Sequence, residues 1–294
     1  MNILLDKEKT TRQHFVPVFY LKNFYHNNQA FWVYEKNSGK IYESNANGIC
    51  YKNNLYETED SGILSDGKYI LTNLIENQLS DVDGKNATFI KGIITRLSSQ
   101  NSTNALILNA SEVRETYEFI NNLIVRHPIA MSNFLTDEKY KLAYENNKNT
   151  NLIKDLFEML GFGDPESFMK VSFKNTYFDS KGKGVSYINY FETMHHVFLK
   201  ATNASFITSD FPVRMDLNYE NRTFNSIYLP LSSDYAVCLG SKRSSNRNRI
   251  VSLNKEMVNN LNKYVLIDGF NTKVVSNSKE QLEDLIKSVN IEHN

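Results

Sequence analysis

Cysteine is scarce in this chain of 294 residues, which holds only Cys50 and Cys238. The two lie far apart in the sequence and lack the spacing of a metal knuckle or a redox pair. Free cysteines usually behave as small buried hydrophobic side chains. We therefore expect two buried thiols and no metal or redox site built from cysteine.

An excess of either charge is also missing, because Lys plus Arg and Asp plus Glu each number 33. The chain thus has no global positive field that would draw it to nucleic acid or to an anionic membrane. No apolar run approaches the ~20 residues of a membrane helix, and the first apolar run is too short for a signal peptide. We expect a cytoplasmic protein without a membrane partner, in which any phosphate binding is local.

Common catalytic motifs are absent as well: the P-loop, the dinucleotide-binding glycine fingerprint, the metalloprotease His-Glu-x-x-His and the Gly-x-Ser-x-Gly elbow. What the chain does have is 41% hydrophobic residues, with 18 Phe and 17 Tyr against one Trp. This composition is typical of a folded protein with an aromatic core.

Strand patterns lie near both ends of the chain, and helical patterns lie between them. Residues 13–57 form the first β unit, with a hairpin turn between the strand patterns at 30–34 and 40–43. Residues 66–202 follow the helical period, and residues 203–294 return to strands with closing helices. This order predicts one α+β domain over residues 1–294, whose terminal β units share one mixed sheet packed on a central group of amphipathic helices.

Some local expectations are specific. The apolar run Phe15–Phe24 is expected to be the N-terminal strand, and residues 187–201 an amphipathic helix. Ser111 and Ser278 are expected to cap helices, and Pro128 to end or bend one.

Four motifs follow one another along the chain: HFVPVFYLKNF at 14–24, RHP at 126–128, TSDFPV at 208–213 and LPLS at 229–232. In these motifs the chain resembles an uncharacterised bacterial family, and the resemblance covers about residues 13–265. The family is a domain of unknown function, so the resemblance implies fold membership and candidate residues but little chemistry. Its members resemble accessory proteins of prophages and phage-defence loci, which implies an effector by association only.

His14, Asp210 and Ser209 come from two of these motifs. His14 suits a general base or a metal ligand, and its alternative is a structural histidine that ties the N-terminal segment to a loop. Asp210 could hold His14, ligate a metal, or cap the turn ahead of Pro212. Ser209 is a weak candidate nucleophile, because no nucleophile elbow surrounds it.

Arg126 suits a phosphate or an acidic partner, and a buried salt bridge with Glu76, Asp83 or Asp210 is an equal alternative. The resemblance implies two glutamates about seven residues apart on one helix; Glu76 matches the first, and the shorter Asp83 stands in place of the second. On a regular helix they project within ~20° of each other but ~10 Å apart along the axis, too far to share one metal ion. Their alternative is a polar flank of an amphipathic helix.

Two further groups attract attention. The pair His195-His196 would diverge by about 100° on a helix, so it cannot share one metal ion there. The one basic run is a possible nucleic-acid or nucleotide contact, with a solvated loop as the alternative. It consists of Lys242, Arg243, Arg247 and Arg249.

Two hypotheses remain open. The first is a hydrolase-like effector, nuclease or nucleotide-processing enzyme, in which His14 handles the proton, Asp210 orients it or a metal, and Arg126 neutralises negative charge. The second is a binding or interaction module in which the same residues are structural. The sequence names neither a substrate nor a cofactor.

Overall fold

A computed structural model describes residues 10–26, 29–57, 73–99, 105–136, 186–218, 223–241 and 249–289, with short pieces between residues 138 and 178. The chain divides into two compact units, each described by itself. The first unit combines Met1–Gln13, Tyr51–Val82 and Pro128–Ser186, and the second combines His14–Cys50, Asp83–His127 and Tyr187–Asn294. A single domain over residues 1–294 stays a prediction.

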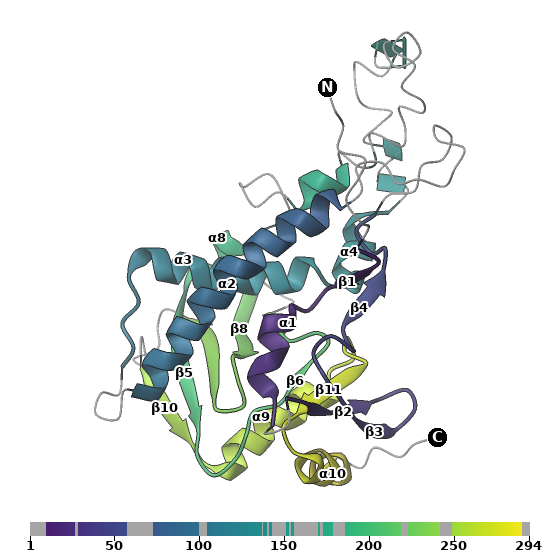
Figure 1. Cartoon of the computed structure of the whole chain (residues 1–294). Helices are drawn as coiled ribbons and strands as arrows, with labels where there is room; N and C mark the ends of the chain where they lie inside the picture. Colours follow the sequence, from purple (N-terminus) through teal and green to yellow (C-terminus); the bar gives the residue numbers. More distant parts are fainter. Residues whose placement is uncertain are drawn as a thin grey trace. The chain divides into compact units, whose positions relative to one another are not determined.

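The N-terminal segment begins with strand β1 (Arg12–His14), which pairs with β4 (Tyr51–Asn53). The expected strand over Phe15–Phe24 is wrong, because helix α1 (Val18–Leu21) and a 3-10 turn occupy it (Figure 1). Pro17 holds φ at −57° just ahead of the helix, where its missing N–H costs nothing. Tyr20, Leu21 and Phe24 are all buried on one face, so the apolar run has a helical and not a strand period.

The first sheet of the second unit has four antiparallel strands in the order β3-β2-β11-β6. Its N-terminal hairpin, β2 (Phe31–Glu35) and β3 (Lys40–Ser44), confirms the predicted turn, in which Gly39 has a φ of 66°. The other two strands, β11 (Lys273–Ser276) and β6 (Thr208–Ser209), come from the C-terminal part. The terminal segments therefore share a sheet as predicted, although this sheet is antiparallel.

The mixed sheet of the fold is the other one, with the strand order β10-β5-β9-β8-β7, where β10 runs parallel to β5. The helix expected over residues 187–201 is wrong: α8 covers only Ile188–Phe191, and Met194–Ala201 is strand β5. Seven residue pairs with β9 hold this segment extended, so tertiary pairing overrides a spacing that also fits a strand. The other strands are β7 (Arg214–Asn218), β8 (Thr223–Pro230), β9 (Tyr235–Ser241) and β10 (Ile250–Leu253).

Capping residues set the helix starts. Asn109, and not the expected Ser111, caps α3, because only from Asn109 does Glu112 stand three residues on and complete a capping box. Ser278 caps α10 as predicted, and α3 ends before Pro128, where α4 begins. The longer helices are α2 (Leu74–Ser99), α3 (Ala110–Val125), α4 (Pro128–Phe134), α9 (Lys255–Ile267) and α10 (Lys279–Ser288).

One hydrophobic cluster joins both sheets of the second unit to helices α9 and α10. Tyr34 comes from the four-stranded sheet, Ala236 from the five-stranded sheet, Val258 from α9 and Leu282 from α10. Each of these four side chains is at most 1% exposed. The predicted α+β class is confirmed, and the two C-terminal helices are part of its core.

Helix α1 is anchored to the C-terminal strands through Tyr20, which is fully buried. Its hydroxyl group donates to the carbonyl oxygen of Pro230 at 2.7 Å and lies 2.8 Å from Oγ1 of Thr208. Of the two thiols, Cys50 is buried as expected and Cys238 only partly. Burial raises the pKa of both thiols, that of Cys238 to about 11, so neither is a thiolate at neutral pH.

Candidate functional site

Arg126 lies at the C-terminal end of α3 with 2% of its surface exposed. Its Nη1 contacts Oδ1 of Asp83 at 2.6 Å, and its Nη2 donates to the backbone carbonyl oxygen of His14 at 2.8 Å. The guanidinium therefore joins α3, α2 and the end of β1. Of the three acids named as possible partners, Asp83 forms a salt bridge with Arg126 in the structure.

Burial raises the pKa of the Asp83 carboxyl group, and the charge and hydrogen bond of Arg126 oppose the shift. The free-energy cost of removing the two charges from water therefore offsets much of the electrostatic attraction between them. Such a pair adds little stability compared with apolar side chains of similar size, but removing one partner leaves a buried charge behind. The pair is suited to fixing one arrangement of the three segments.

Asp210 follows strand β6 directly and is 5% exposed. Its Oδ1 accepts hydrogen bonds from the backbone N–H groups of Thr272 and Lys273 at 2.9 and 3.1 Å. Its Oδ2 accepts one from the Thr272 hydroxyl group at 2.6 Å. Across the described residues, all hydrogen bonds of this carboxylate go to the start of β11, so it caps that strand and not the turn ahead of Pro212.

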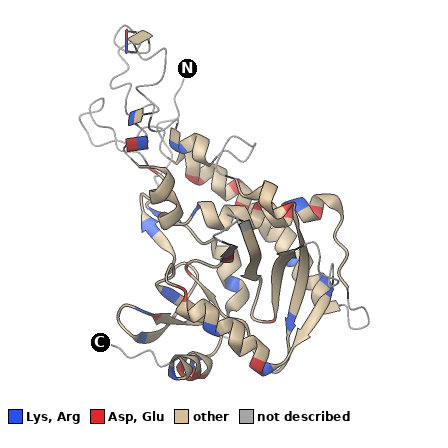
Figure 2. Cartoon of the chain, turned by 180° about the vertical axis from the view of Figure 1, so that it is seen from behind, with Lys and Arg blue, Asp and Glu red and all other residues tan. Residues whose placement is uncertain are grey.

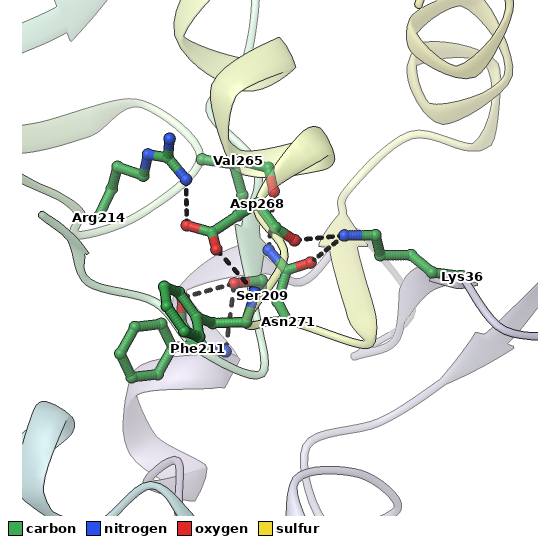
Figure 3. A network of polar contacts seen from close by, with 8 residues as sticks. Lys36, Ser209, Phe211, Arg214, Val265, Asp268 and Asn271 are labelled. Atoms are coloured by element: carbon green, nitrogen blue, oxygen red, sulfur yellow. Dashed lines mark hydrogen bonds and ion pairs between the residues drawn. The ribbon is translucent and has the colours of Figure 1, made fainter. Parts of the chain in front are cut away.

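Ser209 is also engaged within its own turn. Its Oγ donates to the carbonyl oxygen of Phe211 at 2.7 Å and accepts from the Phe211 N–H group at 3.2 Å. Figure 3 shows this hydroxyl group among the polar contacts around the loop that follows α9. A nucleophilic serine needs its hydroxyl group paired with a base. Here the hydroxyl group closes a turn.

A polar network that the sequence motifs do not predict surrounds Asp268, which is 5% exposed. Its carboxylate binds the Arg214 guanidinium and, at 2.9 Å, the N–H group of Phe270 (Figure 3). The Lys36 ammonium group donates to the Asp268 carbonyl oxygen at 2.5 Å and to Oδ1 of Asn271 at 2.8 Å. Burial lowers the pKa of Lys36. The only sequence signal was that Arg214 directly follows the 208–213 motif.

Glu35 and Lys273 form an ion pair across β2 and β11, at 2.6 Å between Oε1 and Nζ. The hydrogen bond that Lys273 donates to Glu35 lowers the pKa of the Glu35 carboxyl group below its ordinary value of 4.5. A carboxylate with a lowered folded-state pKa stabilises the fold above its unfolded pKa, and this contribution is lost as the pH falls through the folded value. The contribution of this pair to the stability of the four-stranded sheet is therefore lost at acid pH.

A Glu35→Gln variant is expected to be less stable than the wild type at pH 7, by a difference that shrinks toward about pH 3. Urea denaturation at both pH values measures it. Glu280→Gln is the matched control, because no hydrogen bond or ion pair of the Glu280 side chain is found among the described residues. A difference between wild type and Glu35→Gln that stays constant over this pH range would contradict the account.

Aromatic side chains from three of the four motifs contact one another. The His127 ring lies 5.3 Å from the Phe15 ring and 4.6 Å from the Phe211 ring, between centroids. The first, second and third motifs are thus neighbours in the core of the second unit. Their charged groups, however, point into separate networks: Arg126 into the pair with Asp83, and Asp210 to the start of β11.

The remaining candidates lie elsewhere. His195 and His196 are buried neighbours on β5, where consecutive side chains point to opposite faces, so they do not share one metal ion. Glu76 lies in the first turn of α2, within the first unit. Lys242, Arg243 and Arg247 fall outside the described residues, and Arg249 forms an isolated bridge with Ala105. The described part holds no group of three or more His, Cys, Asp and Glu side chains placed to bind a metal ion.

Among the described residues, no helix has the length and hydropathy needed to cross a membrane. No curated protein and no solved structure matches the chain. A family described as "Protein of unknown function (DUF4238)" matches residues 12–280, a range that includes all four motifs. The chain therefore belongs to this family of proteins of unknown function.

Proposed function

We propose that the protein is a cytoplasmic, non-catalytic binding module in which the polar motif residues hold neighbouring segments of the second unit together. The Asp210 carboxylate carries the proposal, because it accepts three hydrogen bonds from Thr272 and Lys273 and so holds β6 to β11. Arg126 and Ser209 support it, since their polar groups bind Asp83, the His14 carbonyl group and Phe211.

The competing hypothesis is a hydrolase-like effector, such as a nuclease or a nucleotide-processing enzyme of a prophage or phage-defence locus. It requires that His14 acts on a proton and that Asp210 or Arg126 serves the same reaction. The Asp210 carboxylate would first have to release its bonds to β11. Nucleic-acid contact through residues 242–249 belongs to this hypothesis and stays a prediction.

Turnover assays on wild type and His14→Ala separate the two hypotheses. The panel contains a p-nitrophenyl ester, a p-nitrophenyl phosphodiester, ATP, single-stranded DNA and RNA, each with added Mg²⁺, Mn²⁺ or Zn²⁺. This variant keeps the backbone carbonyl group that Arg126 binds. A binding module shows no turnover that depends on His14. Turnover by the wild type that falls roughly 100-fold or more in a His14→Ala protein of unchanged melting temperature would overturn the proposal.

A further inference from the structure

We infer that a cleft between α9 and α10 binds a short polar peptide segment that carries both a basic and an acidic group. This inference rests on the proposed function, for which it names a site and a ligand class. The cleft lies within the second unit and has a volume of about 670 Å³. Ligand pockets commonly measure ~300–1,000 Å³, so a ligand of a few residues fits.

The lining of the cleft is rich in amide side chains. Asn259 and Asn260 come from α9, and Asn203 and Asn277 from the loops that precede β6 and α10. An asparagine side chain offers both donors and acceptors, as a peptide unit does. Asn203, Asn259 and Asn260 have no side-chain hydrogen bond within the described part of the chain. Their amides are available to a peptide backbone.

Hydrogen bonds to Ser205 hold part of this lining in place. Nε2 of Gln281 and Nδ2 of Asn262 donate to the Ser205 carbonyl oxygen at 2.6 and 2.9 Å. Nδ2 of Asn277 donates to its hydroxyl group at 3.2 Å. These contacts tie α9 and α10 to one loop, so this wall is preorganised and a ligand does not have to order it.

The two helices bring unlike charges to the cleft. Helix α9 contributes Lys255 and Lys263 beside one acid, whereas α10 contributes Glu280 and Asp284. The side chains of these four residues form no hydrogen bond or ion pair with any described residue. Figure 2 shows Lys and Arg interspersed with Asp and Glu along the described helices. A ligand with one basic and one acidic side chain complements both walls.

Other ligand classes match the lining less well. Three acidic side chains, those of Glu256, Glu280 and Asp284, face two lysines, which disfavours a phosphate or another anion. A nucleobase is usually held by an aromatic face, and no aromatic side chain is among the described residues that line the cleft. A neutral saccharide would use the amides but would leave the charges of both walls unmatched.

The test uses pools of terminally blocked tetrapeptides of the form Asp-x-x-Lys, Asp-x-x-Asp and Lys-x-x-Lys, with x drawn from Asn, Ser, Gln and Ala. Binding to the full chain is followed by microscale thermophoresis. We expect saturable binding of the Asp-x-x-Lys pool and affinity roughly fivefold lower for each single-charge pool, since an exposed ion pair changes affinity by up to such a factor. Equal affinity for the three pools would overturn the inference, as would no binding at about 5 mM peptide.

Two cleft variants, each with a matched control, test whether the peptide binds in the cleft. Lys263→Glu and Asp284→Lys are each expected to weaken binding of the Asp-x-x-Lys pool about fivefold. Lys287→Glu and Asp81→Lys make the same charge changes at exposed residues that do not line the cleft, and they should leave binding unchanged. Unchanged binding in both cleft variants, with melting temperatures equal to the wild type, would contradict the inference.

The two proposals fail separately. Loss of the cleft hypothesis leaves the His14→Ala turnover result unaffected, because none of the motif candidates His14, Arg126 and Asp210 lines the cleft. Turnover that depends on His14 would refute the non-catalytic proposal even if the cleft binds peptide. The two experiments together therefore assign each outcome to one proposal.

Discussion

The Asp83→Leu variant is expected to lose about 3–5 kcal/mol of free energy of unfolding. It leaves the Arg126 guanidinium, 2% exposed, without its carboxylate partner. The hydrogen bond to the His14 carbonyl oxygen remains, but the opposite charge beside a buried guanidinium is lost, and such a loss is among the most destabilising consequences of a single substitution. Urea denaturation followed by circular dichroism measures the loss.

Two further variants make this result specific. The double variant Asp83→Leu/Arg126→Met should recover more than half of the lost stability, because replacing both charges removes the desolvation cost. Asp81→Leu, at an exposed position on the same helix, should change stability by no more than about 0.5 kcal/mol. The pair is not structural if Asp83→Leu and Asp81→Leu behave alike.

The Asp210→Ala variant is expected to lose about 3 kcal/mol, because two backbone N–H groups and one hydroxyl group lose a buried, charged acceptor. Asp210→Asn is the matched variant: its amide oxygen can still accept from both N–H groups, so a loss nearer 1 kcal/mol is expected. Chemical denaturation compares the two. A catalytic carboxylate commonly sits at a cost to stability, so an Asp210→Ala protein at least as stable as the wild type would favour the enzyme hypothesis.

Local chemistry predicted several elements correctly. The hairpin of β2 and β3 follows from a glycine-containing turn between two strand patterns, and Ser278 is a strong N-cap. The strand expected over Phe15–Phe24 is wrong because an unbroken apolar stretch fits a helix as well as a strand. Pro17 at its start, which favours a helix beginning at Val18, was the signal that could have corrected it.

Long-range pairing explains the other errors. Residues 194, 196 and 198 fit a strand, while 191, 194 and 198 fit a helix, and only the pairing of β5 with β9 decides. The same holds for the candidate site. The salt bridge of Arg126 with Asp83 is one of three that the sequence allows, beside those with Glu76 and Asp210, and the local pattern does not choose among them. The bond from Asp210 to Thr272 depends on β6 meeting β11, which no local pattern reveals.

A double-mutant cycle between Asp210 and Thr272 tests most directly whether the motif acid holds the fold. The free energies of unfolding of wild type, Asp210→Ala, Thr272→Val and the double variant are measured by denaturation. A structural bond at 2.6 Å between the hydroxyl and carboxylate groups predicts a coupling of about 1 kcal/mol or more, with the double variant losing less than the sum of the single losses. Additive losses within about 0.3 kcal/mol, with Asp210→Ala as stable as the wild type, would contradict the account.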